Sequence, residues 1–288
     1  DDDFGSIEAL ESFIFTDSLN ASLDKMCENM SQETESGNIN SAFTWTGAFG
    51  CGKSSLAVAF GSLFSGSKSQ RSRNAKYISE SIAEKFWNIL NPGVKGFHVL
   101  PISAERERAH ILIAKKLIDL NLYKFNKDEN EITENEVLDA LDLLCKRDDQ
   151  YGGIMIILDE MGQCLEHAAN NQGDGVNFFQ NLAEKAARSK KKLVFIGILH
   201  LGFKEYANNM TKTALTDWEK ISGRFTDIAI DMAQALFNDA GNPIILDPAC
   251  GEGELLIQAI LHYRQNGVQL GAHQILGVDI DPEMVEIA

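Results

Sequence analysis

The sequence predicts an α/β fold built on a parallel β-sheet. Two continuous apolar runs, at 152–158 and 192–199, are typical of strands buried on both faces of a sheet. Shorter β-prone runs lie at 42–46 and 97–102. Segments with apolar residues at helical spacing separate the four runs, and strands that alternate with helices favour parallel pairing. The chain of 288 residues has room for one large domain or for two ordinary ones.

Helices are expected before and between these strands. Apolar residues recur at helical intervals over 6–30, which predicts one helix or two ahead of the first strand. Further helices are predicted at 53–64, 76–90, 104–119, 133–146 and 176–189. We expect polar loops at 31–40 and at 65–74, where serine and basic residues dominate.

The charge balance is strongly acidic. With 26 Lys and Arg against 42 Asp and Glu, the net charge is −16, so the surface as a whole repels nucleic acid, which does not exclude a local basic groove. The compact positive clusters lie at 68–73 and 190–192, and we interpret them as solvated charge rather than as DNA contacts. No apolar run approaches the ~18–20 residues of a membrane-spanning helix, so no membrane partner is expected.

Five cysteines are scattered along the chain without a C-x-x-C pair. An odd number at such spacings predicts neither a disulfide framework nor a zinc finger. We therefore expect small buried thiols in a reducing, cytoplasmic environment.

A glycine-rich segment follows the predicted strand 42–46. Residues 47–54 fit the pattern G-x-x-x-x-G-K-[ST] between a strand and a helix, which is the context of a phosphate-binding loop. Its glycines let successive backbone N–H groups point at phosphate oxygens, and a helix N-terminus favours the same anions. The lysine would reach the β- and γ-phosphates, and the serine hydroxyl would bind Mg²⁺. The predicted binding residues are Gly47, Gly50, Gly52, Lys53, Ser54 and Ser55.

Two acidic residues follow the apolar run at 152–158. Asp159 would hold Mg²⁺ through water, and Glu160 would polarise the water that attacks the γ-phosphate. A glutamate directly after the aspartate favours hydrolytic ATPases of the additional-strand (ASCE) class over kinases and small GTPases. The sequence contains no N-K-x-D motif, which favours ATP over GTP.

Two further residues extend the predicted ATPase site. His200 follows the run 192–199, at the position where this ATPase class places a polar side chain beside the γ-phosphate. Arg224 follows a glycine near a domain edge, where it would act as a finger on the ATP of a neighbouring subunit. The alternatives are a histidine hydrogen-bonded to a loop and an arginine in a structural ion pair.

With these motifs, residues 40–228 resemble a P-loop ATPase of the AAA+ or STAND type. The stretch from His200 through Phe203, Tyr206 and Trp218 to Arg224 resembles the large ATPases of bacterial anti-phage defence operons, such as BREX-type systems. The resemblance implies ATP and Mg²⁺ as cofactors and ATP hydrolysis as the activity. It also implies other defence-system subunits as partners, and a homo-oligomer.

Residues 231–288 differ in composition from the rest of the chain. They carry nine acidic residues and a single basic one, Arg264, and thus half of the net charge. A strand, a glycine turn and a helix start are predicted over 243–256, and a second strand begins at 275 and ends in acidic residues. Such a β-α-β unit binds a nucleoside, because its glycine turn lets the ligand approach the backbone closely and its acidic residue accepts hydrogen bonds from the ribose hydroxyls.

The motifs of this segment are D-P-A-C-G-E-G-E-L-L at 247–256 and G-V-D-I-D-P at 277–282. They closely resemble the S-adenosylmethionine site of N6-adenine DNA methyltransferases. By that resemblance, the methionine side of the cofactor is lined by Asp247, Ala249, Gly251 and Gly253, while Asp279 binds the ribose and Ile280 packs on the adenine. The family's N-P-P-[YF] or D-P-P-[YF] motif does not occur in the sequence, so we expect half of a cofactor site here and the catalytic half elsewhere.

The predicted organisation has three parts: a helical segment at 1–40, a P-loop ATPase domain at 41–230 and a partial, Rossmann-like methyltransferase segment at 231–288. Neither end resembles a natural terminus, so we expect a fragment or a chain with gaps closed up.

The first functional hypothesis is Mg²⁺-dependent ATP hydrolysis coupled to an adenine-specific DNA methyltransferase module, with DNA as a partner, in prokaryotic DNA modification or anti-phage defence. The alternatives are an ATP-binding, oligomerising signalling scaffold without sustained turnover, and a DNA adenine methyltransferase with a regulatory ATPase remnant.

Overall fold

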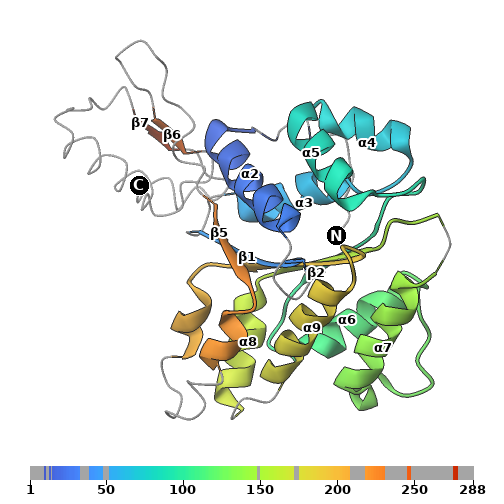
Figure 1. Cartoon of the computed structure of the whole chain (residues 1–288). Coiled ribbons are helices and arrows are strands. Elements are labelled where there is room, and N and C mark those ends of the chain that lie inside the picture. Colours follow the sequence, from blue (N-terminus) through green and yellow to red (C-terminus); the bar gives the residue numbers. More distant parts are fainter. Residues whose placement is uncertain are drawn as a thin grey trace.

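The computed structural model describes a five-stranded parallel sheet with helices on both faces (Figure 1). The described residues are 10, 13, 15–32, 39–47, 52–147, 150–171, 175–207, 218–230, 245–247 and 275–277. The strands are β1 (Ala42–Thr46), β2 (His98–Ser103), β3 (Ile154–Asp159), β4 (Leu193–Leu199) and β5 (Thr226–Ala229), in the order β2-β3-β4-β1-β5. Every neighbouring pair in this sheet is parallel, which confirms the predicted α/β fold with a parallel sheet.

Two helical layers enclose the sheet. One layer holds α2 (Asp17–Ser31), α3 (Lys53–Ser62), α4 (Lys68–Ala75) and α5 (Glu80–Leu90). The other holds α6 (Ala109–Asp119), α7 (Glu134–Cys145), α8 (Met161–Asn170) and α9 (Val176–Arg188). Short 3-10 turns, η1 (Glu129–Glu131) and η2 (Phe203–Ala207), complete the described connections. The sheet thus lies between two apolar cores, one under each helical layer.

The strand side chains alternate between these two cores, because successive residues of a strand point to opposite faces. On β4, the α6–α9 core receives Leu193, Phe195 and Leu199, whereas the α2–α5 core receives Val194, Ile196 and Ile198. All seven residues of β4 are buried, which explains why the sequence shows an unbroken apolar run there.

One sequence prediction of local structure is wrong. The expected polar loop at 65–74 contains α4, whose start carries a capping box in which the Ser67 N–H donates to Gln70 Oε1 (2.8 Å). The helix is short, and it buries only Arg71, Asn74 and Ala75. It therefore shows no apolar stripe in the sequence from which helical periodicity could be recognised.

Arg71 also corrects the interpretation of the cluster at 68–73 as solvated charge. Its side chain is only 3 % exposed, and its guanidinium donates to the carbonyl oxygens of Gly66, Gly93 (2.8 Å) and Val94 (3.5 Å). A buried cation needs such acceptors, because an unpaired one would lose its hydration without compensation. Burial lowers the pKa of the guanidinium. Arg71 thus ties α4 to the turn that precedes β2.

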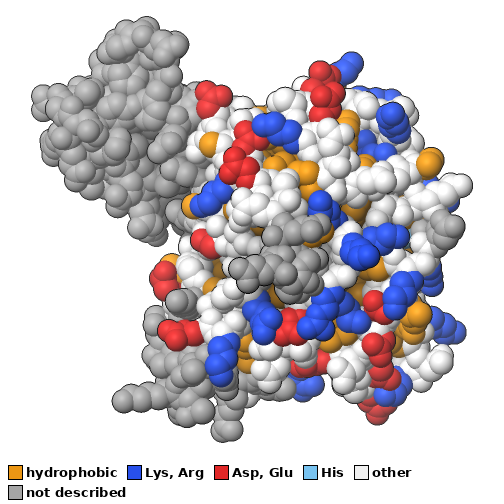
Figure 2. Space-filling model, in the orientation of Figure 1, with side chains coloured by type: hydrophobic (Ala, Val, Ile, Leu, Met, Phe, Trp, Pro, Cys, Tyr) orange, Lys and Arg blue, Asp and Glu red, His pale blue; other side chains and the backbone are white. Residues whose placement is uncertain are grey.

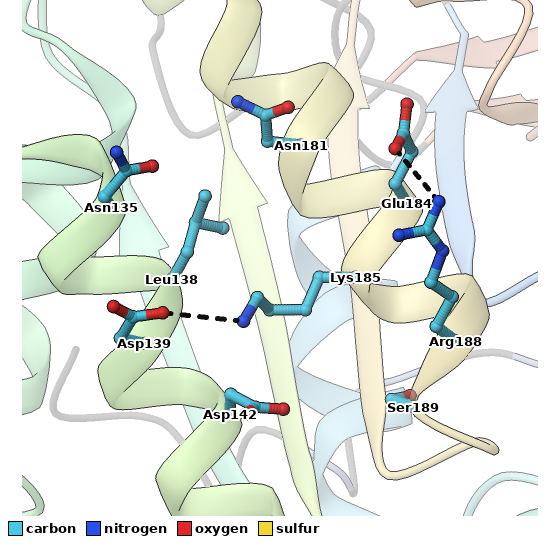
Figure 3. Close-up of a pocket in the computed structure, with 9 residues that line it drawn as sticks. All are labelled: Asn135, Leu138, Asp139, Asp142, Asn181, Glu184, Lys185, Arg188 and Ser189. Carbon is cyan, nitrogen blue, oxygen red and sulfur yellow. Dashed lines mark hydrogen bonds and ion pairs between the residues drawn. The ribbon is translucent and has the colours of Figure 1, made fainter.

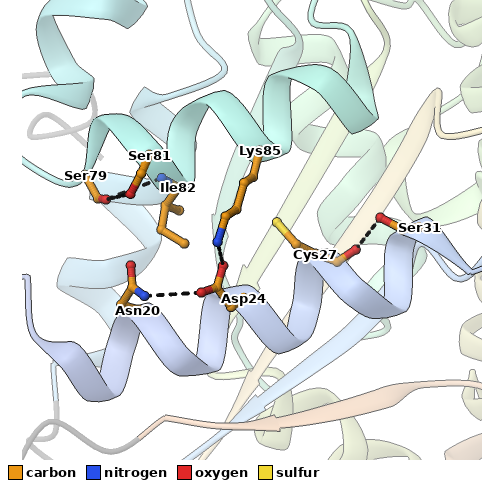
Figure 4. Close-up of polar contacts among 8 residues, drawn as sticks. All are labelled: Asn20, Asp24, Cys27, Ser31, Ser79, Ser81, Ile82 and Lys85. Atoms are coloured by element: carbon orange, nitrogen blue, oxygen red, sulfur yellow. Dashed lines mark hydrogen bonds and ion pairs between the residues drawn. The ribbon is translucent and has the colours of Figure 1, made fainter.

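On the face seen in Figure 2, Lys and Arg side chains are interspersed with Asp and Glu. Ion pairs join several of the described elements. Figure 4 shows one of them, in which Lys85 of α5 reaches Asp24 of α2 (2.5 Å) while Asn20 donates to the other oxygen of the same carboxylate (3.2 Å). A groove of about 590 Å³ runs beside this pair, between α2 and α5.

The predicted burial of the cysteines is confirmed for the three that the structure describes. Cys27, Cys145 and Cys164 are buried and form no disulfide. Burial raises the pKa of each of these thiols to about 12. Cys51 and Cys250 lie outside the described residues.

The acidic segment at the end of the sequence contributes a second, two-stranded sheet. Strands β6 (Ile245–Asp247) and β7 (Ile275–Gly277) pair in parallel, with Asp247 opposite Gly277. Both strands lie where the sequence predicts them. The other predicted cofactor residues of this segment lie outside the described part of the chain: Ala249, Gly251, Gly253, Asp279 and Ile280. Among the residues described, no helix is both long and apolar enough to cross a membrane.

Candidate functional site

The carboxyl edge of the sheet collects most of the predicted ATPase residues. Gly47 follows β1, Asp159 ends β3 and His200 follows β4. Because β4 lies between β1 and β3, the ends of those two strands are two strand spacings apart, or about 9.5 Å. Gly47 and the acidic pair at 159–160 therefore follow strands that lie on opposite sides of β4.

Lys53 is the first residue of α3, directly after the glycine-rich segment. Gly52 is the N-cap of this helix, and its φ of 78° is a left-handed conformation that glycine adopts without steric cost. The Lys53 side chain is 4 % exposed, and its Nζ donates to the carbonyl oxygen of Gly47 at 2.6 Å. Ser54 and Ser55 lie exposed in the first turn of α3. Gly50 lies outside the described residues.

Glu160 occupies a strained turn between β3 and α8. Its φ of 56° and ψ of 32° lie in the left-handed region, which costs a non-glycine residue about 1–2 kcal/mol. The Glu160 N–H donates to Asp159 Oδ1 (2.9 Å), which orients that carboxylate within the turn. Strained backbone of this kind concentrates at functional sites, where the surrounding structure holds a side chain in a required place.

His200 contacts Glu160 across the edge of the sheet. The distance from His200 Nε2 to Glu160 Oε1 is 2.9 Å, and the two residues follow the neighbouring strands β4 and β3. The histidine side chain is 16 % exposed and the glutamate side chain 37 % exposed, so the pair is open to solvent on one side. The imidazole thus holds one carboxylate oxygen, while the other is not engaged by this contact.

The segment after His200 packs closely on α8. The Leu201 N–H donates to the hydroxyl of Tyr206 in η2 (3.4 Å), and burial raises the pKa of that hydroxyl. The Tyr206 ring lies over Gly162, where a Cβ atom would come within 2.5 Å of the tyrosine oxygen. Trp218 donates from Nε1 to the carbonyl oxygen of Phe203 (2.9 Å). The sequence did not indicate that position 162 requires a glycine for close packing against Tyr206. The one available signal was its place two residues after Glu160.

The structure separates Arg224 from the other predicted residues of the same chain. Arg224 precedes β5, and Thr226 of β5 pairs with Phe43 near the start of β1, so the arginine lies toward the amino edge of the sheet. There its Nη2 lies 3.0 Å from Oε1 of Glu184 in α9.

Beside this ion pair, a polar pocket of about 440 Å³ lies between α7 and α9 (Figure 3). Its walls carry opposite charges, with Lys185 4.0 Å from Asp139 and Arg188 3.5 Å from Glu184.

The chemistry of the carboxyl edge fits a nucleotide with Mg²⁺. An exposed serine hydroxyl and the Asp159 carboxylate offer the hard oxygen ligands that Mg²⁺ accepts together with waters and substrate phosphates. No group of three or more His, Cys, Asp or Glu side chains that could hold a metal ion by themselves occurs in the described ranges. A metal at this edge would therefore depend on phosphate oxygens for its remaining ligands.

Comparison with known proteins gives no match to a family model and no match to a curated protein. Three similar solved structures are the ORC2 protein of Aeropyrum pernix in ADPNP and ADP complexes, a Walker-type ATPase of Pyrococcus abyssi and AMPPCP-bound DnaA from Aquifex aeolicus. Their TM-scores are 0.43, 0.39 and 0.37, with identities of 13%, 12% and 13%. They cover 78%, 91% and 94% of this chain, which in turn spans 51%, 64% and 59% of their lengths.

Proposed function

We propose that residues 41–230 form a Mg²⁺-dependent ATPase domain of the P-loop type. The observation that carries the proposal is the arrangement of Lys53, Asp159 and the Glu160–His200 pair at one edge of a parallel sheet. Strand β4 is inserted between the strand that leads to the lysine and the strand that ends in the acidic pair. This order agrees with the additional-strand class that the acidic pair indicates.

In this proposal the triphosphate lies at the N-terminus of α3. Lys53 leaves the Gly47 carbonyl oxygen and donates to the β- and γ-phosphates, while the N–H groups at the start of the helix donate to phosphate oxygens. Ser54 and Asp159 would hold Mg²⁺, which neutralises the charge that develops on the phosphates. The predicted cradle also includes Gly50, Gly52 and Ser55.

Glu160 has the position of the general base. Its carboxylate would accept a proton from a water whose oxygen attacks the γ-phosphorus, and the bond from that phosphorus to the bridging oxygen of ADP breaks. ADP and inorganic phosphate leave, and the proton passes from the glutamate to solvent. The bond from His200 holds the base in one orientation, which lowers the entropy that must be lost to reach the reacting geometry.

Two substitutions test the ATPase proposal. Lys53→Ala should abolish ATP binding and hydrolysis, whereas Glu160→Gln should keep binding and lower turnover by about 10²–10⁴-fold. Lys76→Ala is the control, because Lys76 is an exposed lysine at the end of α4. Hydrolysis at the wild-type rate in Lys53→Ala would refute the proposal. ATP-dependent assembly that survives Glu160→Gln, without turnover in the wild type, would instead support the signalling scaffold.

We further propose that residues 231–288 supply the S-adenosylmethionine half-site of an adenine-specific DNA methyltransferase module, coupled to the ATPase in a DNA modification or defence system. The parallel pairing of β6 and β7 supports this, because it places Asp247, the first residue of one predicted cofactor motif, opposite Gly277, the first residue of the other. Isothermal titration with S-adenosylmethionine tests it. We expect the wild type and the control Asp239→Ala to give heat of binding and Asp247→Ala to give none. The absence of heat with the wild type would contradict the proposal.

A further inference from the structure

We propose that Asp227 is a positioning residue that fixes the start of the phosphate-binding segment and thereby sets its affinity for nucleotide. This inference rests on the proposed ATPase function. Asp227 lies in the edge strand β5, outside every motif in the sequence, and its carboxylate binds two side chains of β1. Thr44 Oγ1 donates to Asp227 Oδ1 at 2.8 Å, and Thr46 Oγ1 donates to Asp227 Oδ2 at 2.9 Å.

The register of the two strands explains this double contact. Asp227 stands directly opposite Thr44 in the parallel pairing, while Thr46 stands opposite Ala229. Thr44 and Thr46 lie two residues apart and therefore share one face of the sheet. The carboxylate can thus bridge them along the strand with one oxygen each, in addition to the backbone hydrogen bonds of the ladder.

Thr46 is the last residue of β1 and leads directly into Gly47. Its carbonyl oxygen accepts from the Ile230 N–H at 2.7 Å, so β5 holds both the backbone and the side chain of this residue. The next carbonyl, that of Gly47, accepts from Lys53 Nζ. A continuous series of contacts therefore runs from Asp227 through Thr46 and Gly47 to the lysine that would bind phosphate.

Strand β5 is itself anchored. The Ser22 hydroxyl of α2 donates to the Ala229 carbonyl oxygen at 2.8 Å, on the strand edge that β1 does not use. At the other end of the strand, the Asn40 side-chain amide bonds to the Thr226 hydroxyl. These contacts hold Asp227 in place, so that its carboxylate can restrict the rotation of the Thr46 side chain through their hydrogen bond.

Removal of the Thr46 hydroxyl should leave the first residues of the phosphate-binding segment less ordered. The binding of nucleotide would then have to supply that ordering, which weakens the apparent affinity. Because Asp227 is exposed, we expect its hydrogen bond with Thr46 to have ordinary strength. Its loss should therefore raise the dissociation constant for nucleotide by about 3- to 10-fold. Thr44 donates to the same carboxylate but lies two residues further from Gly47, so its loss should leave the affinity unchanged.

The experiment compares Thr46→Val with Thr44→Val in the full chain, by titration with a fluorescent ATP analogue and Mg²⁺. Both variants remove one hydroxyl from the same carboxylate, so thermal unfolding curves show whether they disturb the fold equally. We expect a dissociation constant about 3- to 10-fold higher for Thr46→Val and within about 2-fold of wild type for Thr44→Val. Thr46→Ser, which keeps the hydroxyl, should restore the affinity, and Asp227→Ala should have no added effect on Thr46→Val.

The outcomes separate this inference from the ATPase proposal. If the wild type binds the analogue, Lys53→Ala does not, and Thr46→Val binds like Thr44→Val, the positioning role of Asp227 is overturned while the ATPase proposal stands. If the wild type does not bind the analogue at all, the ATPase proposal fails and the inference falls with it. Failure of Thr46→Ser to restore the affinity would likewise overturn the inference, because it would assign the effect to the shape of the side chain.

Discussion

The Nε2 atom of His200 lies 2.9 Å from the Oε1 atom of Glu160, although 40 residues separate the two in sequence. The contact exists because β3 and β4 are adjacent parallel strands that end at the same edge of the sheet. It restrains the side chain proposed as the general base before any substrate is bound, which is the kind of pre-organisation that accelerates a reaction without strengthening ground-state binding.

Replacement of His200 by Ala should therefore separate turnover from affinity. We expect steady-state ATP hydrolysis to fall by about 10-fold or more, because Glu160 would sample other rotamers, while nucleotide affinity stays within about 2-fold of wild type. His200→Gln, which retains a donor, should recover part of the rate. A loss of affinity without a loss of turnover would show that His200 contacts the nucleotide and does not orient the glutamate.

Arg224 and Glu184 allow a test of the predicted arginine finger. The Arg224 side chain is 44% exposed, so loss of this ion pair should cost at most about 1 kcal/mol of unfolding free energy. A drop in turnover of 10-fold or more in Arg224→Ala, with little change in stability, would therefore indicate a role at a neighbouring subunit. Recovery of hydrolysis when inactive Arg224→Ala and inactive Glu160→Gln chains are mixed would establish action between subunits. If Arg224→Ala and Glu184→Ala are equally and modestly destabilised and both turn over ATP normally, the role of Arg224 is the structural ion pair alone.

Much of the fold follows from the sequence. The long apolar runs at 152–158 and 192–199 predict β3 and β4, because a strand that is buried on both faces consists almost entirely of apolar residues. Strand β5 was not predicted, since of its four residues only Ile228 is buried and one is an aspartate. Helix α8 was also missed, because it begins directly after the acidic pair without a polar loop to mark its start.

The site was predictable only in part. Lys53, Asp159 and Glu160 carry motif signals, and the parallel sheet brings them to one edge. The Asp227 contacts with β1 depend on the register of an edge strand, which no local pattern encodes. The burial of Arg71 likewise depends on a distant turn, whereas the polar and basic residues around it at 68–73 indicated a solvated charge.

Arg71→Met should destabilise the chain much more than the matched change Arg73→Met. The first substitution removes a buried guanidinium and leaves the part-buried carbonyl oxygens of Gly66, Gly93 and Val94 without their charged donor, which should cost about 2–4 kcal/mol of unfolding free energy. Arg73 is exposed on the same helix, and its replacement should stay within about 0.5 kcal/mol. Urea denaturation measures both values, and equal effects would contradict the structural role of Arg71.

The buried thiols should resist alkylation. Because burial raises the pKa of Cys27, Cys145 and Cys164 to about 12, their reactive thiolate forms are scarce at pH 8. We expect iodoacetamide at pH 8 to leave these three residues unmodified in the native chain and to modify all of them in urea. Peptide mapping by mass spectrometry reads each site separately, and rapid native labelling of any of the three would show that its helix opens readily.

Glu136 should contribute to stability in a pH-dependent manner. The Lys127 ammonium, 2.7 Å away, lowers the pKa of this carboxyl to about 2, with help from the Thr133 N–H and hydroxyl. A lowered pKa in the folded state stabilises the fold above the unfolded pKa of about 4.3, and this contribution disappears as the pH falls toward 2. The difference in urea midpoint between wild type and Glu136→Gln should thus shrink between pH 4.5 and pH 2. A difference that stays constant over that range would contradict this pairing.

The left-handed backbone at Glu160 has an implication for laboratory evolution. Glycine would occupy that turn without the conformational penalty of about 1–2 kcal/mol that a side chain incurs there. A library screened only for heat resistance should therefore enrich Glu160→Gly and yield robust chains that no longer consume ATP. If an acidic residue is retained at position 160 although glycine fits the backbone better, selection is acting on catalysis and not only on stability.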